Sequence, residues 1–349
     1  MVPYWRFKGM LFSAVSGGVR HRFMDLSYQA VGCNYFPVSV GLRSQALKMK
    51  FAASESGGCF LKPDFPLEKA ISIFFRRFSK DLTGPVHYQE FIGETLSIIY
   101  SPFYFENRIM DAVLNQPVFD FLPDDFTADA FDRENPDWKI RFIPALCPDC
   151  GWDLSGDRDS LVLLCNNCQN VWFPGGKSLK KIKFGVLKEK GDIYLPFWRI
   201  KAEIKGVRLD SYSDLIKVAN LPKVCLPGWE NIDFYFWALA FKVRPRVFLR
   251  LNRGITLSQP PEEHLSTLPE ARIYPVTLPA TEAVESLKIQ LASFARPEKR
   301  YLPLLSSIKI KPKKVKLVYI PFKEGHHEFI QESFGLSLNK NLLKMAQNL

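Results

Sequence analysis

The chain of 349 residues lacks any long hydrophobic run. Its strongest apolar stretch covers only residues 234–241, whereas a helix that spans a bilayer needs about 20 apolar residues. The first residues also lack the basic head and apolar run of a secretory signal peptide. We therefore expect a cytoplasmic protein without a transmembrane segment.

Motifs of common enzyme classes are also missing. The sequence contains no glycine-rich phosphate loop, no nucleophile elbow and no H-E-x-x-H motif, and it has only five histidines. His326 and His327 follow each other between Glu324 and Glu328. Adjacent side chains on a strand point to opposite faces, so this segment is interpreted as a polar surface turn. We assign no catalytic residue, and the sequence favours a protein that is not an enzyme.

Cysteine is the residue type whose spacing is most informative. Four of the seven cysteines form two C-x2-C pairs separated by 14 residues: Cys147, Cys150, Cys165 and Cys168. Two residues between thiolates let one tight turn direct both sulfurs at one ion, and Gly151 suits the left-handed position of such a turn. The apolar residues 161–164 predict a strand that leads into the second pair. Four thiolates leave no position open for water or substrate, which favours one structural Zn2+.

Residues 142–176 resemble the zinc-ribbon family, on the C-P-x-C-G turn and the paired C-x2-C motifs quoted above. The resemblance implies a β-hairpin that holds structural zinc through these four cysteines. Rubredoxin iron sites share the first turn but usually have a second C-P-x-C-G, which is absent here. Zinc ribbons bind nucleic acid, dock on proteins or stabilise a fold, so the resemblance does not choose among these functions. The other cysteines, Cys33, Cys59 and Cys225, are interpreted as small apolar residues in a reducing compartment.

Two stretches of the chain resemble each other. Residues 3–8, Pro-Tyr-Trp-Arg-Phe-Lys, match residues 196–201, Pro-Phe-Trp-Arg-Ile-Lys. Weaker matches pair Val40–Arg43 with Phe241–Arg244, helices predicted after Pro66 and Pro279, and residues 99–103 with 318–322. The offsets of 193, 201, 213 and 219 rise steadily along the chain. Such a series predicts an internal duplication with small insertions; chance matches in a Pro- and Phe-rich chain are the alternative.

The predicted fold is α+β, dominated by strands, with two similar lobes on either side of the ribbon. Lobe A covers residues 1–118 and lobe B residues 193–349. The ribbon, residues 142–176, lies between an acidic linker, 119–141, and a basic linker, 177–192. Both linkers are interpreted as solvated connectors, and docking of the acidic one beside a basic surface is the alternative.

The net charge of +11 is concentrated in two segments. One is 177–190, with six lysines, and the other is 296–316, with eight bases and one acid. These segments supply tentative sites for nucleic acid or another anion: Lys177, Lys180, Lys181, Lys183, Lys309, Lys311, Lys313, Lys314 and Lys316. Alternating lysines on a strand stand about 6.6 Å apart, near the phosphate spacing of a single nucleic-acid strand. Lysines that keep the protein soluble or protect a sheet edge are the simpler interpretation.

Three functions follow from these observations. The first is a non-catalytic zinc-ribbon scaffold or adaptor that binds other proteins in a cytoplasmic assembly. The second is a nucleic-acid-binding protein that uses the ribbon and both lysine-rich segments. The third is an enzyme with a polar site between the lobes that leaves no recognisable motif. Contact of the basic segments with an anionic membrane surface is left open as well.

Overall fold

The computed structural model describes residues 1–47, 49–50, 58–80, 82, 84–119, 122, 126–134, 142–157, 159–176, 178–261 and 264–346. The structure is mixed and rich in strands, as the sequence predicts. The chain divides into two compact units. Unit 1 comprises Met1–Gly9, Met24–Thr83 and Glu94–Arg141, and unit 2 comprises Met10–Phe23, Gly84–Gly93 and Phe142–Leu349.

A three-stranded sheet has its outer strands β2 and β3 paired with the central β1. Its strands are β1 (Val2–Val15), β2 (Gly18–Gln29) and β3 (Val86–Ser101). Unit 1 also contains α1 (Arg43–Ala46), α2 (Leu67–Ser79), the turn η1 (Ala128–Ala130) and a small sheet of β4 (Phe103–Phe105), β5 (Ile109–Asp111) and β6 (Gln116–Pro117). Helix α2 begins directly after Pro66, where the sequence predicts it, and buries Phe74 and Phe78.

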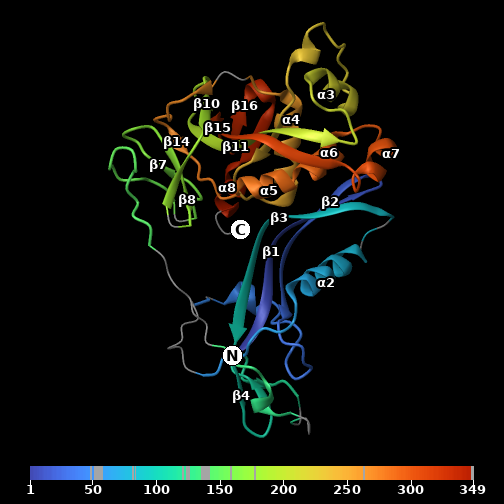
Figure 1. The fold of residues 1–349 in the computed structure, drawn as a ribbon, viewed down its shortest axis with the longest axis vertical. Coiled ribbons are helices and arrows are strands. Elements are labelled where there is room, and N and C mark those ends of the chain that lie inside the picture. The colour runs from blue at the N-terminus through green and yellow to red at the C-terminus, as the bar shows by residue number, and fades with distance from the viewer. Residues whose placement is uncertain are drawn as a thin grey trace. The chain divides into compact units, whose positions relative to one another are not determined.

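Unit 2 is built on a larger sheet in which β11 (Ile193–Lys205) lies between β12 (Phe236–Leu239) and β15 (Lys309–Glu324), antiparallel to both (Figure 1). The remaining strands of this sheet are β10 (Phe184–Leu187), β13 (His264–Leu265), β14 (Arg272–Ile273), β16 (Glu328–Gln331) and β17 (Leu336–Asn339). Strands β10 and β14 pair in parallel with β15 and β11, respectively.

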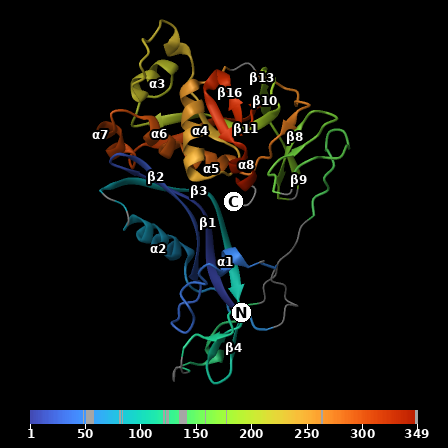
Figure 2. The ribbon, with the colours of Figure 1, turned by 180° about the vertical axis from the view of Figure 1, so that it is seen from behind.

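Helices cover the sheet of unit 2 and close two apolar cores. They are α3 (Tyr212–Ala219), α4 (Pro245–Ser258), α5 (Ala280–Glu285), α6 (Leu287–Phe294), α7 (Glu298–Tyr301) and α8 (Lys340–Ala346), with short turns η2 (Trp229–Asn231), η3 (Leu302–Leu304) and η4 (Glu332–Phe334). One core contains Trp198 and Tyr319, and the other contains Phe197 and Val318. Neighbouring residues of one strand enter different cores, because side chains alternate across a sheet. Figure 2 shows α4 in front of the sheet.

The two Trp-Arg segments make matching hydrogen bonds. The indole N–H of Trp5 donates to the Phe65 carbonyl at 2.8 Å, directly before the Pro66 that starts α2. The indole N–H of Trp198 donates to the Leu278 carbonyl at 2.9 Å, directly before the Pro279 that starts α5. Recurrence of this contact supports a role for both tryptophans in packing.

Backbone hydrogen bonds match in the same way. Ala30 N–H donates to the Pro3 carbonyl, and Ala240 N–H donates to the Pro196 carbonyl, each at 3.0 Å. The two acceptors are 193 residues apart and the two donors are 210 apart; the second offset would match Val31 with Phe241. The predicted match of Val40–Arg43 with Phe241–Arg244 uses a different offset, 201, and stays a prediction.

Two small antiparallel strand pairs, β5–β6 and β16–β17, also have matching registers. Met110 pairs with Pro117 in unit 1, and Ile330 pairs with Ser337 in unit 2, both pairs being 220 residues apart. Asn115 and Gly335, at the same offset, both have positive φ. These agreements support the predicted duplication by geometry as well as by residue identity, and the duplication itself stays a prediction.

The two predicted linkers have structure of their own. Within 177–192 the chain forms β9 (Ser178–Ile182) and β10, so this basic segment is not a free connector. Within 119–141 the described residues 126–134 pack on unit 1: Glu134 N–H bonds the Phe60 carbonyl at 2.9 Å, and the Phe126 ring contacts Tyr35. The acids Asp120, Asp124, Asp125 and Asp137 lie outside the described residues. Neither segment therefore acts simply as a solvated connector.

In the described part of the chain, no helix is both long and apolar enough to cross a bilayer. The predicted turn at His326 and His327 is confirmed, since both lie between β15 and β16 with their ring nitrogens 2.9 Å apart.

Candidate functional site

The first cysteine pair lies in the tight turn that the sequence predicts. Gly151 N–H donates to the Cys147 carbonyl at 2.8 Å, and Cys147 N–H donates to the Trp152 carbonyl at 2.8 Å. Gly151 has φ of 71°, a left-handed conformation that glycine adopts without steric cost. The turn thereby directs both sulfurs to one side. A hydrogen bond from the Trp152 backbone lowers the pKa of the Cys150 thiol to about 6, which favours its thiolate form.

The second pair repeats this geometry with a different residue. Gln169 follows Cys168 as Gly151 follows Cys150, and it also has a positive φ, of 59°. The Asn170 amide donates to the Cys168 sulfur at 3.2 Å and to Asp149 at 2.8 Å, so it links the two turns. Desolvation raises the pKa of the Cys168 thiol to about 12. Metal binding here would have to displace that proton, and the charge of a divalent cation favours the displacement.

The four sulfurs fit a single tetrahedral ion. Those of Cys147 and Cys168 are 3.5 Å apart, as are those of Cys150 and Cys165, and all four lie within 4.8 Å of one another. A tetrahedral zinc site with Zn–S bonds of 2.3 Å has sulfurs about 3.8 Å apart. The donor set of four thiolates suits zinc and keeps no position open for substrate. A metal at this cluster would therefore stabilise the fold and would not catalyse a reaction.

The ribbon is attached to the body of unit 2. Its strands are β7 (Leu163–Leu164), β8 (Val171–Gly175) and β9, the green segment at the left of Figure 1. Trp172 packs against Cys147 and Cys165 in a small core. The Gln169 side chain accepts a hydrogen bond from Leu268 N–H at 2.8 Å, and Leu161 N–H donates to the Val276 carbonyl at 2.7 Å. The cysteine cluster therefore belongs to unit 2.

The structure separates the tentative lysine sites into two groups. Lys180 and Lys181 lie on β9 beside the ribbon, where Lys181 pairs with Asp149 at 2.8 Å. Lys183 precedes β10, and its carbonyl accepts a hydrogen bond from Leu317 N–H at 3.3 Å. The other tentative sites are all on β15: Lys309, Lys311, Lys313, Lys314 and Lys316. Lys177 lies outside the described residues.

The pairing of β11 with β15 places most of these lysines on one face of the sheet. Lys205 pairs with Lys309, and Lys201 pairs with Lys314. Paired residues point to the same face in an antiparallel ladder, and alternate residues share it. The opposite face carries apolar residues such as Ala202 and Ile310, which join one of the two cores. We call the charged side the lysine face; its cations are Arg199, Lys201, Lys205, Lys309, Lys311, Lys313, Lys314 and Lys316.

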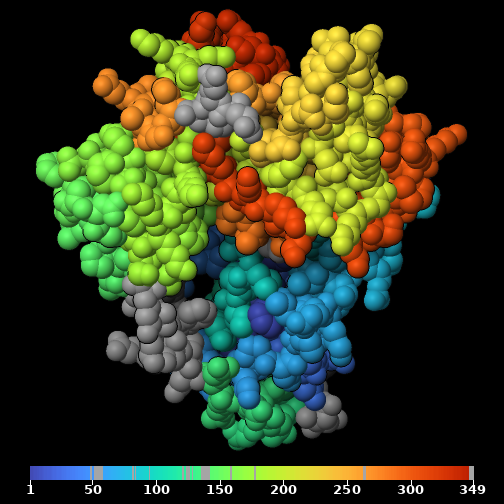
Figure 3. All heavy atoms as spheres, turned by 45° about the horizontal axis from the view of Figure 1, so that its top comes forward, coloured from blue at the N-terminus to red at the C-terminus, as the bar shows by residue number. Residues whose placement is uncertain are grey.

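The lysine face carries few compensating charges. Among the described residues, Glu203 and Asp233 pair with its lysines: Lys313 pairs with Glu203 at 2.6 Å, and Lys201 pairs with Asp233 at 2.8 Å. Hydrogen bonding to these lysines lowers the pKa of each carboxyl, so both stay ionised at neutral pH. Among the described residues, the cations of this face outnumber its carboxylates, so the face is positive. Figure 3 shows the orange-red start of β15 exposed on the surface.

An aromatic ring borders this surface. The guanidinium carbon of Arg199 lies 3.4 Å from the centre of the Tyr235 ring, and the Lys201 ammonium lies 5.7 Å from it. Tyr235 is partly exposed. Cations and a ring at one place are the combination that holds stacked bases and phosphates.

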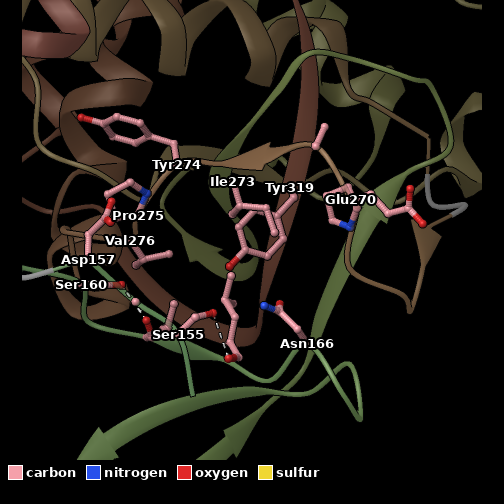
Figure 4. Close-up of a pocket in the computed structure, with 15 residues that line it drawn as sticks. Ser155, Asp157, Ser160, Asn166, Glu270, Ile273, Tyr274, Pro275, Val276 and Tyr319 are labelled. Atoms are coloured by element: carbon pink, nitrogen blue, oxygen red, sulfur yellow. Dashed lines mark hydrogen bonds between the residues drawn. The ribbon is translucent and has the colours of Figure 1, made fainter. Parts of the chain in front are cut away.

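A cleft between the ribbon and the body of unit 2 is the best candidate for an enzymatic site (Figure 4). It encloses about 420 Å³. Asp157 and Glu270 are its carboxylates, and in the described part of the chain no histidine, cysteine, lysine or arginine lines it. Burial raises the pKa of Tyr274 to about 12 and also raises that of Tyr319, so both phenols stay protonated. The hydroxyls of Ser155 and Ser160 donate to the backbone carbonyls of Leu164 and Val162.

The sequence pointed to β15 but missed the contribution of β11. Arg199, Lys201 and Lys205 join the lysine face only through strand pairing. Their alternating pattern in the sequence was a usable signal for a strand with one wet face. What it could not show was which strand, more than 100 residues away, would lie beside it.

Comparisons of the chain with protein-family models, with curated proteins and with solved structures found no match.

Proposed function

We propose that this protein is a non-catalytic nucleic-acid-binding protein that holds single-stranded nucleic acid on the lysine face. The observation that carries the proposal is the convergence of cations from β11 and β15 on one face of the sheet. Cations along a strand neutralise successive phosphates and release counterions, which supplies affinity. The partly exposed Tyr235 ring at the border of the face offers a stacking position for a base.

The predicted duplication provides a reason to treat these lysines as functional. Lys309–Lys316 matches residues 90–97 at the offset of 219, and the earlier segment contains no lysine or arginine. A strand at this place therefore does not need lysine in order to fold. Protection of the sheet edge is the competing explanation, because β10 pairs with β15 only from Leu317 onward. Edge protection concerns β15 alone and gives no reason for Lys201 and Lys205 on the neighbouring strand.

The test is binding of a fluorescent 20-residue single-stranded DNA to zinc-loaded protein over a series of salt concentrations. We expect the logarithm of the affinity to fall linearly with the logarithm of salt, with a slope of about −0.7 for each phosphate neutralised. The variant K311E/K314E should bind much more weakly and with a flatter slope. The matched control K69E/K80E removes two exposed lysines from α2 and its end in unit 1 and should bind like the wild type.

Two outcomes would contradict the proposal. One is absence of DNA and RNA binding at low salt. The other is an unchanged slope in K311E/K314E, which would assign any binding to another surface.

A scaffold or adaptor remains the second candidate, because the ribbon exposes apolar side chains. Trp152 is 60% exposed and Leu146 is 52% exposed, both beside the cysteine turns. Exposed aromatic residues commonly anchor protein partners. If nucleic acid does not bind, a protein that co-purifies with the wild type but not with W152A would favour this function.

A further inference from the structure

A second positive site lies in unit 2, in a hollow of about 550 Å³. Three segments far apart in the sequence form it: the tip between β1 and β2, one side of α4, and residues 293–298. Figure 2 shows the tip beside α6 and α7. The N–H of Gly17 at this tip donates to the Glu298 carboxylate at 3.2 Å, which fixes the hairpin against the third segment. The volume is within the usual range for small-molecule sites, about 300–1,000 Å³.

Arginines dominate the charge of this hollow. Arg246, Arg250 and Arg253 line it from α4, and Arg296 lines it from the third segment. Residues four and seven positions apart share one side of a helix, so the three guanidinium groups of α4 follow one stripe about 10 Å long. Glu298 is the carboxylate among the described lining residues. The hollow therefore carries a net charge of about +3 from four arginines and one glutamate.

Two of the four arginines already have protein partners. Arg250 donates to the Ser337 carbonyl at 2.6 Å, and Arg296 lies 3.5 Å from Glu298 and donates to the Ala295 carbonyl at 2.8 Å. Arg246 and Arg253 have no carboxylate partner among the described residues. Their donors thus remain open to a ligand.

The surroundings of these arginines affect their charge and that of His21. Burial, together with the nearby Arg296 charge, lowers the pKa of Arg253. Burial likewise lowers the pKa of His21, with Arg246 contributing, which favours the neutral imidazole. Between the guanidinium groups the lining is apolar, with Val19, Leu249 and Leu257. Like charges beside an apolar floor favour an anion that neutralises several of them at once.

We propose that this hollow is a binding site for a small phosphorylated molecule, with Arg246 and Arg253 as its principal phosphate ligands. The planar guanidinium fork matches phosphate oxygens in pairs, which lysines on an open strand do not. The bounded volume and apolar floor fit a compact ligand better than a continuous nucleic-acid strand. This site is separate from the lysine face, and the proposal does not rest on nucleic-acid binding.

The test is calorimetric titration of the full-length protein with inorganic tripolyphosphate at low salt. We expect saturable binding with one site per chain, weakened at least about tenfold in R246Q/R253Q. Both arginines are exposed, so the variant should keep the wild-type melting temperature. The matched control R76Q/R77Q removes two exposed arginines from α2 and should bind tripolyphosphate normally.

Further results can overturn this assignment. Absence of tripolyphosphate binding would contradict it, as would equal binding by R246Q/R253Q. If K311E/K314E loses tripolyphosphate binding instead, the anion site belongs to the lysine face. Should R246Q/R253Q fail to fold, chemical modification of wild-type arginines by phenylglyoxal decides the question. Tripolyphosphate should then protect Arg246 and Arg253 but not Arg76, and equal modification with and without ligand would refute the site.

Discussion

The two Trp-Arg strands use the same tryptophan contact but employ their arginines differently. Arg6 on β1 forms a two-point ion pair with Asp25 on β2, with N–O distances of 2.8 and 2.7 Å. Arg199 on β11 instead stacks on the Tyr235 ring. In both places the tryptophan contact attaches the start of a helix to a strand. The surroundings of the two arginines therefore differ although the tryptophan contacts agree.

The residues that follow the two arginines also differ between β1 and β11. After Arg6, β1 continues into apolar residues, and Met10 and Phe12 enter a core of unit 2. After Arg199, β11 continues with Lys201 and Lys205 on the lysine face. Features shared by the two strands thus report on folding, whereas features confined to β11 and β15 are candidates for binding. Variants of both classes test this distinction.

The largest effect is expected at the ribbon, which has no counterpart among the described residues of unit 1. C165S should abolish binding of one zinc per chain, because it removes a buried thiolate from a set of four. Structural zinc contributes about 10–16 kcal/mol to small zinc-dependent folds. Metal analysis and thermal melting check this, with the exposed Cys225 in C225S as control. Full zinc content in C165S would refute the site.

The next effect concerns the shared tryptophan contact. W198F and W5F each remove an indole N–H and leave a carbonyl without its partner, which costs about 1–3 kcal/mol where the carbonyl is buried. Trp198 is 7% exposed and Trp5 is more exposed, so W198F should cost more. Chemical denaturation measures both free energies of unfolding. A cost confined to one variant would argue against equivalent roles.

The two arginine environments should differ in strength. D25N replaces a charge-assisted, two-point pair with a neutral partner, and such hydrogen bonds contribute about 1.5–3 kcal/mol. Y235L removes a cation–π contact worth about 0.5–1 kcal/mol at a partly exposed site. Denaturation curves recorded in low and high salt measure the loss of unfolding free energy in each variant. A larger loss in Y235L would reverse the comparison.

The smallest effect is expected at α3, which lies between β11 and β12 and has no counterpart between β1 and β2. Burial alone would raise the pKa of Asp214, but hydrogen bonds from Asp210 N–H and from Ser211 outweigh it and lower that pKa. The ionised carboxylate therefore stabilises the fold above its usual pKa of about 4. This contribution disappears as the pH falls through the lowered pKa. D214N should lose about 1 kcal/mol at pH 7.

The pH dependence distinguishes this cap from ordinary packing. Unfolding free energies of wild type and D214N should converge as the pH falls from about 4 through the lowered pKa of Asp214, because the wild-type carboxyl then becomes protonated in the folded state. D210N, which alters the neighbouring side chain but keeps its N–H donor, serves as the control. A constant difference between wild type and D214N at all pH values would contradict the assignment.

Local patterns predicted several parts of the structure correctly. The position of α2 follows from Pro66 and the apolar spacing after it, and the cysteine turns follow from C-x2-C and Gly151. Both depend on residues a few positions apart. The basic segment 177–192 was misjudged as a connector because its lysines hid two short strands, β9 and β10, which form by pairing with β8 and β15. Whether a short segment forms a strand depends mainly on the neighbouring strands with which it pairs.

The sequence by itself determined the cysteine cluster that could hold a metal ion, the start of α2 and the alternation of charged and apolar residues along β11 and β15. Each of these depends on covalent geometry and on side chains close together in the chain. Only the tertiary structure decided that Lys201 lies beside Lys314, and that the β1–β2 tip meets α4 and Glu298. Such contacts join residues more than 100 positions apart, and they are selected by packing of whole elements in competition with many other pairings.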